Sequence, residues 1–142
     1  MQLIEVRGNV FTADDDYYFC HCISADYEMG AGIAVEMNKR FDIKRQLSKE
    51  YGDMLVFPNC IRTGRVYNLV TKRHYYNKPT YYDLACALNV MRDVEMPQTD
   101  ELVKIAMPRI GCGLDRLEWT NVREIIETTF QNSNVNIMVF SL

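Results

Sequence analysis

The sequence predicts a single α/β domain with a sandwich architecture. Short apolar runs alternate with longer stretches of helical periodicity along all 142 residues, and no repeat or low-complexity linker divides them. Two of the apolar runs lead into glycine-containing loops, Gly30–Gly32 and Gly111–Gly113, as strands of α/β proteins do at their binding edge. Because 48% of the residues are apolar, the chain can bury a full core, and we expect one domain over residues 1–142.

Six segments are predicted to be strands. Each is apolar or alternating and is bounded by turn-forming or charged residues. They are Gln2–Val6, Tyr17–Ile23, Met54–Phe57, Arg65–Thr71, Val103–Met107 and Val135–Phe140. We therefore expect a sheet of about six strands.

Helical periodicity is clearest where Tyr81, Leu84 and Leu88 recur at steps of three and four residues. Thr80 and Asp83 can form a capping pair at the start of this helix. Further apolar stripes predict helices over residues 33–41, 43–51 and 119–130. The helices and strands alternate, as they do when helices cover a sheet.

Composition excludes several classes of function. The net charge of −3 removes the strong attraction on which non-specific nucleic-acid binding depends, so an anionic ligand must be held locally. No run of 18 apolar residues exists, and the N-terminus lacks the basic start and cleavage site of a signal peptide. We expect a soluble, cytoplasmic monomer without membrane contact.

The five cysteines are an odd number at irregular spacing, which favours reduced thiols over a disulfide framework. Cys20, His21 and Cys22 suggest a metal cluster at first. Consecutive residues of a strand point to opposite faces, however, so we expect no metal site. Cys112 could pair with a histidine as nucleophile and base, but a cysteine between two glycines is more typical of a small packing residue.

The two glycine loops together predict an anion site. The segment from Ser24 to Ala34 contains a strand end, a polar loop, small residues and a helix start, whose free amides suit a phosphate or diphosphate. The stretch from Met107 to Asp115 repeats the strand and glycines and ends in a carboxylate. Either loop alone is explained equally well as a simple turn. Neither matches the dinucleotide fingerprint, and a Walker A loop is absent.

Two other features stand beside these loops. Lys72 ends a predicted strand, where it is either solvated or, if desolvation or a cation such as Arg73 favours loss of its proton, a nucleophile. Tyr75-Tyr76 and Tyr81-Tyr82 flank Lys78-Pro79. Aromatic residues beside basic ones stack on bases or adenine, although tyrosine is as common as a packing residue.

Together, the loops, the lysine and the aspartate resemble a macrodomain, in the branch that contains the terminal ADP-ribose protein glycohydrolase. The resemblance covers nearly the whole chain. Its most specific segments are His21–Ser24, Met29–Val35, Thr71-Lys72, Lys78–Tyr81, Met107–Leu117, Trp119 and Asn121-Val122.

The resemblance implies a three-layer α/β/α sandwich with a mixed sheet of about six strands and ADP-ribose bound across the strand ends. The diphosphate would lie between the Gly30–Gly32 loop and the Gly111–Leu114 loop. The implied ADP-ribose-binding residues are Gly8, Asn9, Val10, His21, Ser24, Met29, Gly30, Ala31, Gly32, Ile33, Ala34, Thr71, Pro108, Ile110, Gly111, Cys112, Gly113, Leu114 and Leu142. No cofactor or metal is implied.

The resemblance also implies a hydrolase that releases ADP-ribose from glutamate and aspartate side chains of modified proteins. Lys72 would attack the anomeric carbon, and Asp115 would be the general acid and base. Three alternatives stay open: release of ADP-ribose from thymidine in DNA, deacetylation of O-acetyl-ADP-ribose, and binding without turnover. ADP-ribosylated protein is the expected partner, and ADP-ribosylated DNA is the alternative one.

Asn9 is a departure from the resemblance, because the family usually has aspartate after the glycine that corresponds to Gly8. That aspartate accepts a hydrogen bond from the adenine amine. An asparagine carbonyl can accept the same bond without the assistance of a charge, so we expect weaker binding of adenine.

Overall fold

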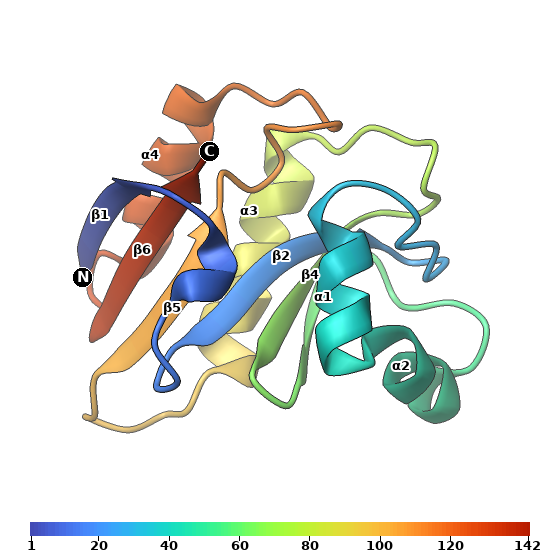
Figure 1. Cartoon of the computed structure of the whole chain (residues 1–142), viewed down its shortest axis with the longest axis horizontal. Coiled ribbons are helices and arrows are strands. Elements are labelled where there is room, and N and C mark those ends of the chain that lie inside the picture. Colours follow the sequence, from blue (N-terminus) through green and yellow to red (C-terminus); the bar gives the residue numbers. More distant parts are fainter.

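The computed structural model describes residues 1–142 as a six-stranded mixed sheet between two layers of helices (Figure 1). The strands are β1 (Gln2–Arg7), β2 (Tyr18–Ser24), β3 (Asn59–Thr63), β4 (Val66–Lys72), β5 (Val103–Pro108) and β6 (Val135–Ser141). Their order across the sheet is β1-β6-β5-β2-β4-β3, and only β3 is antiparallel to its neighbour. The carboxyl ends of five strands therefore meet at one edge.

Two pairs of helices cover the two faces of the sheet (Figure 1). The helices are α1 (Ile33–Phe41), α2 (Ile43–Tyr51), α3 (Tyr81–Val90) and α4 (Trp119–Phe130), with short turns η1 (Val10–Thr12) and η2 (Met91–Glu95). Buried residues of α3 and α4 pack in one core on one face, and those of α1 and α2 pack in a second core on the other. The predicted three-layer sandwich is confirmed.

The predicted strand Met54–Phe57 is wrong, and the third strand is β3, directly after it. Val56 is 74% exposed, and Pro58 has no backbone N–H to donate to a neighbouring strand. The segment Met54–Phe57 was predicted as the strand because it is more apolar than Asn59–Thr63, which forms the strand. β3 pairs with β4 alone, as an edge strand, so a partly polar sequence is sufficient there.

The capping pair predicted for α3 is present. The hydroxyl of Thr80 accepts from the backbone N–H of Asp83 at 3.1 Å, and the Asp83 carboxylate accepts from the N–H of Thr80 at 3.4 Å. This reciprocal arrangement satisfies two of the free amides at the helix start. It sets the point at which the loop after β4 turns into the helix.

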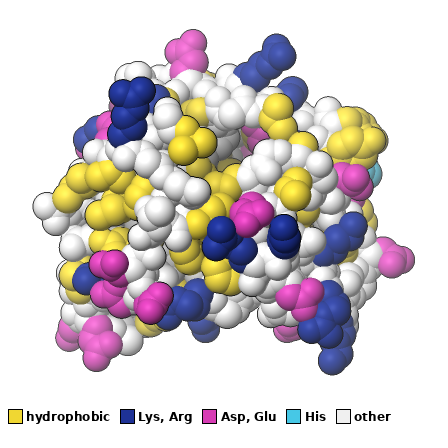
Figure 2. Space-filling model, in the orientation of Figure 1, with side chains coloured by type: hydrophobic (Ala, Val, Ile, Leu, Met, Phe, Trp, Pro, Cys, Tyr) yellow, Lys and Arg dark blue, Asp and Glu magenta, His cyan; other side chains and the backbone are white.

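The surface is mixed in charge. On the face drawn in Figure 2, acidic and basic side chains are interspersed, in agreement with the small net charge of the chain. None of the helices combines the length and hydrophobicity needed to span a bilayer.

Candidate active site

A cavity of about 810 Å³ lies at the carboxyl ends of β2, β4 and β5. Parallel strands bring their following loops to the same edge of a sheet, which is the usual place for ligands in α/β folds. One wall is the loop from β2 into α1, and the other is the loop from β5 towards α4. Lys72, the last residue of β4, also lines the cavity.

The two glycine loops face each other across this cavity. A β-carbon on Gly32 would lie 3.5 Å from the Cδ1 atom of Leu114, a residue of the opposite loop. Lys78 holds the second loop in place, because its Nζ donates to the carbonyl oxygen of Leu114 at 2.6 Å. Gly32 is the N-cap of α1 and has a φ of 62°, so the chain turns into the helix beside the cavity. The first amides of α1 make this wall suitable for an anion.

Lys72 and Asp115 form an ion pair at the cavity wall. The Lys72 Nζ lies 2.7 Å from an Asp115 carboxylate oxygen, although Lys72 ends β4 and Asp115 lies in the loop after β5. Their side chains are only 15% and 13% exposed. A charge-assisted hydrogen bond that is shielded from water is stronger than the same contact on an open surface. The pair therefore places an amine and a carboxylate in direct contact beside the anion-binding loops.

The cysteines near this pair are unsuited to nucleophilic catalysis. Burial, followed by the negative charge of Asp115, raises the pKa of Cys22 to about 12. Burial also raises the pKa of Cys112, whose Sγ donates to the carbonyl of Ile110 at 3.4 Å. Both thiols are therefore neutral near pH 7. No three His, Cys, Asp or Glu side chains are grouped as metal ligands would be.

Most of the predicted site residues line this cavity. They are Ser24, Met29, Gly30, Ala31, Gly32, Ile33, Ala34, Lys72, Pro108, Ile110, Gly111, Gly113, Leu114 and Asp115. The structure thus brings together the two glycine loops, Lys72 and Asp115, which the sequence places far apart.

His21 and Thr71 do not reach the cavity, because both lie inside the sheet. His21 is fully buried, and its Nε2 lies 2.6 Å from Oδ1 of Asn68 on the neighbouring strand. Thr71 is 1% exposed. Neither residue lines the cavity, and the ligand contacts that the resemblance implies for them stay predictions.

A second group of predicted residues lies at the ends of β1 and β6, outside the cavity wall. The backbone N–H of Gly8 donates to the carbonyl of Ser141 at 2.8 Å, next to the exposed Leu142. The Oδ1 of Asn9 accepts from the N–H of Phe11 at 2.9 Å and caps η1. The side-chain oxygen that we expect to accept a hydrogen bond from the adenine amine thus already accepts one from the backbone. Val10 is buried, and Cys112 also lies outside the wall. The adenine contacts of this group stay predictions.

Several residues of the cavity wall are absent from the predicted site. They are Cys22, Ile23, Glu28, Tyr75, Lys78, Arg109 and Arg116. In the sequence, Tyr75 and Lys78 belong to an aromatic and basic segment, and Lys78 also begins one of the segments that carry the resemblance. Arg109 is also tied to the edge of the sheet, since it lies 3.3 Å from the carboxylate of Glu5.

The comparisons with known proteins agree with this geometry. No protein-family model matches the chain. The ADP-ribose glycohydrolase OARD1 of Bos taurus is 40% identical and that of Homo sapiens 39%, each aligned to 96% of this chain and 90% of its own length.

Solved structures share the fold. The macrodomain of Mycobacterium tuberculosis DarG superposes with a TM-score of 0.74 at 18% identity, over 99% of this chain and 98% of its own. The structure of Thermosipho africanus DarTG in complex with ADP-ribose gives 0.71 at 18% identity, over 98% of this chain and 41% of its own. By the identity and coverage of the curated relatives, the chain belongs to the macrodomain family, in the branch of the ADP-ribose glycohydrolases.

Proposed function

We propose that this protein removes ADP-ribose from glutamate and aspartate side chains of modified proteins. The observation that carries the proposal is the shielded contact between Lys72 and Asp115 beside two glycine loops suited to a diphosphate. The relatives at about 40% identity are named ADP-ribose glycohydrolases, which supports the same class of reaction.

In the proposed complex, the diphosphate of ADP-ribose lies between the loop at Gly30–Gly32 and the loop at Gly111–Leu114. The amides at the start of α1 and the open backbone at Gly113, which has no atom within 4 Å of an added β-carbon, favour close approach of the phosphates. The ribose that carries the acceptor then extends towards Lys72. The adenine extends towards the ends of β1 and β6.

The ion pair supplies both halves of the chemistry. Asp115 accepts a proton from Lys72, and the free amine of Lys72 forms a bond to the anomeric carbon. The acceptor carboxylate leaves with the electron pair of its C–O bond to the anomeric carbon, which gives a glycosylamine on Lys72. After the nitrogen loses a proton, the bond from the anomeric carbon to the ring oxygen breaks and the ring oxygen takes up the proton held by Asp115. The opened sugar then remains on Lys72 as a Schiff base. Water then hydrolyses the Schiff base, which releases ADP-ribose and restores the amine.

The test compares wild-type protein with Lys72→Ala on a peptide that carries ADP-ribose on glutamate. We expect the wild type to release ADP-ribose and the variant to release none, while both bind free ADP-ribose. Sodium borohydride added during turnover should leave a covalent ADP-ribose adduct on the wild type alone, located at Lys72 by mass spectrometry. Full release by Lys72→Ala would refute the assigned role of this residue. Thymidine-linked ADP-ribose in DNA provides the comparison substrate.

A further inference from the structure

A rigid aromatic turn stands at the end of the cavity that holds the catalytic pair. It follows β4 directly and contains His74, Tyr75, Tyr76 and Asn77. The N–H of His74 donates to Oδ1 of Asn77 at 2.9 Å, and the N–H of Asn77 donates to the carbonyl of His74 at 3.0 Å. The rings of His74 and Tyr76 stack in parallel with centroids 5.2 Å apart. These contacts close the turn on itself.

One carboxylate ties this turn to the neighbouring loop from β2 into α1. Asp26 accepts the N–H of Tyr75 at 2.9 Å on one oxygen. Its other oxygen accepts the hydroxyl of Ser24 at 2.5 Å and the N–H of Glu28 at 3.2 Å. Although burial alone would raise the pKa of Asp26, these hydrogen bonds hold it below its ordinary value, so the carboxylate is ionised near pH 7. The backbones of the turn and of the loop after β2 are therefore held together at one residue.

Within this anchored turn, the ring of Tyr75 stays uncovered. Tyr75 is 57% exposed and lines the same cavity as Lys72 and Asp115. Its ring makes a T-shaped pair with the ring of Tyr76, with centroids 5.3 Å apart. A fixed backbone with an exposed aromatic ring is preorganised for contact with a ligand, because little conformational freedom is lost on binding.

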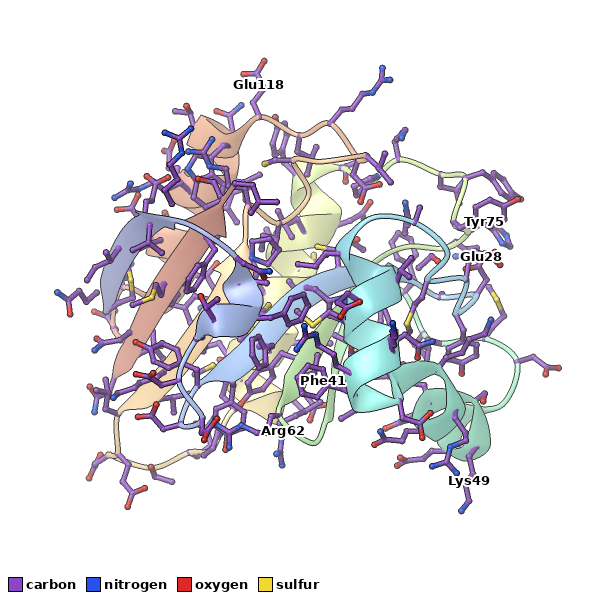
Figure 3. All side chains as sticks on the ribbon, in the orientation of Figure 1. Glu28, Phe41, Lys49, Arg62, Tyr75 and Glu118 are labelled. Carbon is purple, nitrogen blue, oxygen red and sulfur yellow. The ribbon has the colours of Figure 1, made fainter.

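The charges around this ring favour a polypeptide over a phosphodiester. Glu28 lines the cavity next to Tyr75, as Figure 3 shows, and the two backbones share the Asp26 carboxylate. Four basic residues line the wall: Lys72, Lys78, Arg109 and Arg116. The first three are engaged by Asp115, the Leu114 carbonyl and Glu5, in that order. The carboxylates of Asp26 and Glu28, whose backbones lie close to the turn, disfavour a phosphate backbone at this point. Tyrosine, with an apolar ring and a polar tip, is enriched at protein interfaces.

We propose that Tyr75 is a specificity-determining residue that contacts the polypeptide carrying the ADP-ribose, with Asp26 as its positioning residue. This inference rests on the proposed function. The ring of Tyr75 packs against the backbone and side-chain stem of the modified glutamate or aspartate, and it holds the bond to be broken over Lys72. ADP-ribose itself lies deeper in the cavity and does not depend on this contact.

The experiment measures binding by calorimetry in a Lys72→Ala background, which prevents turnover. The ligands are free ADP-ribose and a peptide with ADP-ribose on one glutamate. Tyr75→Ala should weaken binding of the peptide by about tenfold and change binding of free ADP-ribose by less than about twofold. Tyr75→Phe should retain most of the affinity for the peptide. Asp26→Asn should show the same selective loss, in a smaller degree.

Tyr82→Ala is the matched control, because Tyr82 is 75% exposed on α3 and does not line the cavity. It should bind both ligands as the parent does. Equal loss for both ligands, or no loss for the peptide, would overturn the role of Tyr75. If Tyr75→Ala weakened binding of ADP-ribosylated DNA but not of the ADP-ribosylated peptide, the choice of a polypeptide as the ligand would be overturned. Because these are binding measurements, their outcome is separate from whether Lys72 performs the reaction.

Discussion

His21 is an internal group whose protonation state follows from its neighbours. The side-chain nitrogen of Asn68 donates to Ile61 and Thr63, so its oxygen faces His21 and accepts from Nε2. The remaining nitrogen, Nδ1, is buried without a partner. Burial lowers the pKa of His21 from 6.5 to about 4, although the hydrogen bond to Asn68 opposes this shift in part. The imidazole is therefore neutral in the folded protein.

The resulting prediction is that stability falls as the pH falls from about 6.5 to 4. In this window the unfolded chain takes up a proton at His21 that the folded protein does not, so stability is fully present above pH 6.5 and declines towards the folded pKa. The loss attributable to this residue is about 3 kcal/mol. Urea unfolding at several pH values measures it, and His21→Gln should flatten the profile.

A second prediction at this scale concerns Asp115. Asp115→Asn retains the shape of the side chain but cannot accept the proton of Lys72, so release of ADP-ribose from a modified peptide should slow by roughly 10²–10⁴-fold. Binding of free ADP-ribose, measured by calorimetry, should persist. Glu118→Gln changes an exposed carboxylate at the start of α4 and should leave the rate unaltered. A rate for Asp115→Asn equal to that of the wild type would remove the carboxylate from the mechanism.

At the scale of elements, the loop after β5 depends on Gly111. Its φ is 73°, and a β-carbon there would lie 2.9 Å from the Cδ1 atom of Leu117. Gly111→Ala should therefore cost about 1–2 kcal/mol of unfolding free energy in urea and also weaken ADP-ribose binding.

Gly64 offers a matched control for this substitution. Its φ of 56° is also positive, but it has open space around it in the turn between β3 and β4. Gly64→Ala should cost about 1 kcal/mol from the backbone alone and leave binding intact. If the two variants lost the same stability and bound ADP-ribose equally, the packing of Gly111 against Leu117 would not shape the site.

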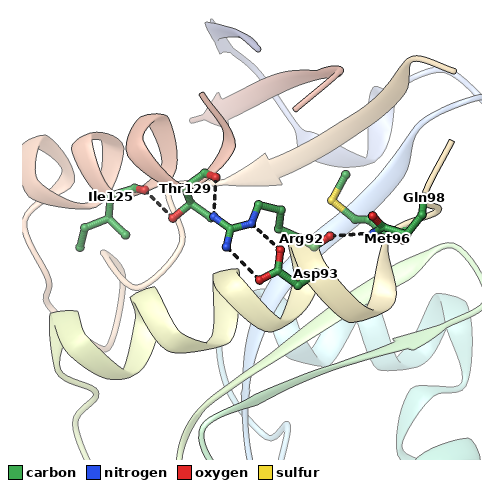
Figure 4. Close-up of polar contacts among 6 residues, drawn as sticks. All are labelled: Arg92, Asp93, Met96, Gln98, Ile125 and Thr129. Atoms are coloured by element: carbon green, nitrogen blue, oxygen red, sulfur yellow. Dashed lines mark hydrogen bonds and ion pairs between the residues drawn. The ribbon is translucent and has the colours of Figure 1, made fainter. Parts of the chain in front are cut away.

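The contact between η2 and α4 gives a prediction about helix packing (Figure 4). Arg92 donates from Nη1 to the carbonyl of Thr129, in the last turn of α4, at 2.9 Å, and pairs with Asp93 at 2.7 Å. A cation on the final carbonyls of a helix stabilises it, so Arg92→Ala should lower the unfolding free energy by about 1 kcal/mol in urea. Asp93→Ala removes only an exposed partner and should have a much smaller effect. Equal losses would assign the stabilisation to the ion pair instead.

At the scale of the whole molecule, the cavity joins the loops of separate strands, so a bound ligand should stabilise the entire fold. At a concentration of 100 Kd, a ligand contributes about 2.7 kcal/mol, which corresponds to a rise in Tm of roughly 5–10 °C for a domain of this size. ADP-ribose should produce this rise with wild-type protein and with Lys72→Ala in a thermal melt. AMP, which lacks the second phosphate and the outer ribose, should produce less. No shift with ADP-ribose would contradict binding in this cavity.

The local pattern of the chain determines most of the elements. The periodicity of α3 and its capping pair at Thr80 and Asp83 are visible in the sequence, since helices depend on contacts three and four residues apart. The glycine loops were equally predictable, because strand ends followed by glycines are a local signal. Lys72 and Asp115 are visible in the sequence as a lysine at a strand end and a carboxylate after the glycines, but their catalytic roles were predicted through the resemblance to a family.

Only the tertiary structure decides which of these local features meet. Strand order across the sheet places Lys72 within 2.7 Å of Asp115, 43 positions along the chain, and buries His21 beneath the cavity where it had been expected to contact the ligand. Antiparallel pairing with β4 likewise makes Asn59–Thr63 a strand, and the more apolar segment before it is not one. These outcomes depend on packing and hydrogen-bond register between segments that are far apart in the chain. Their free energies cannot be inferred from any one local stretch of sequence.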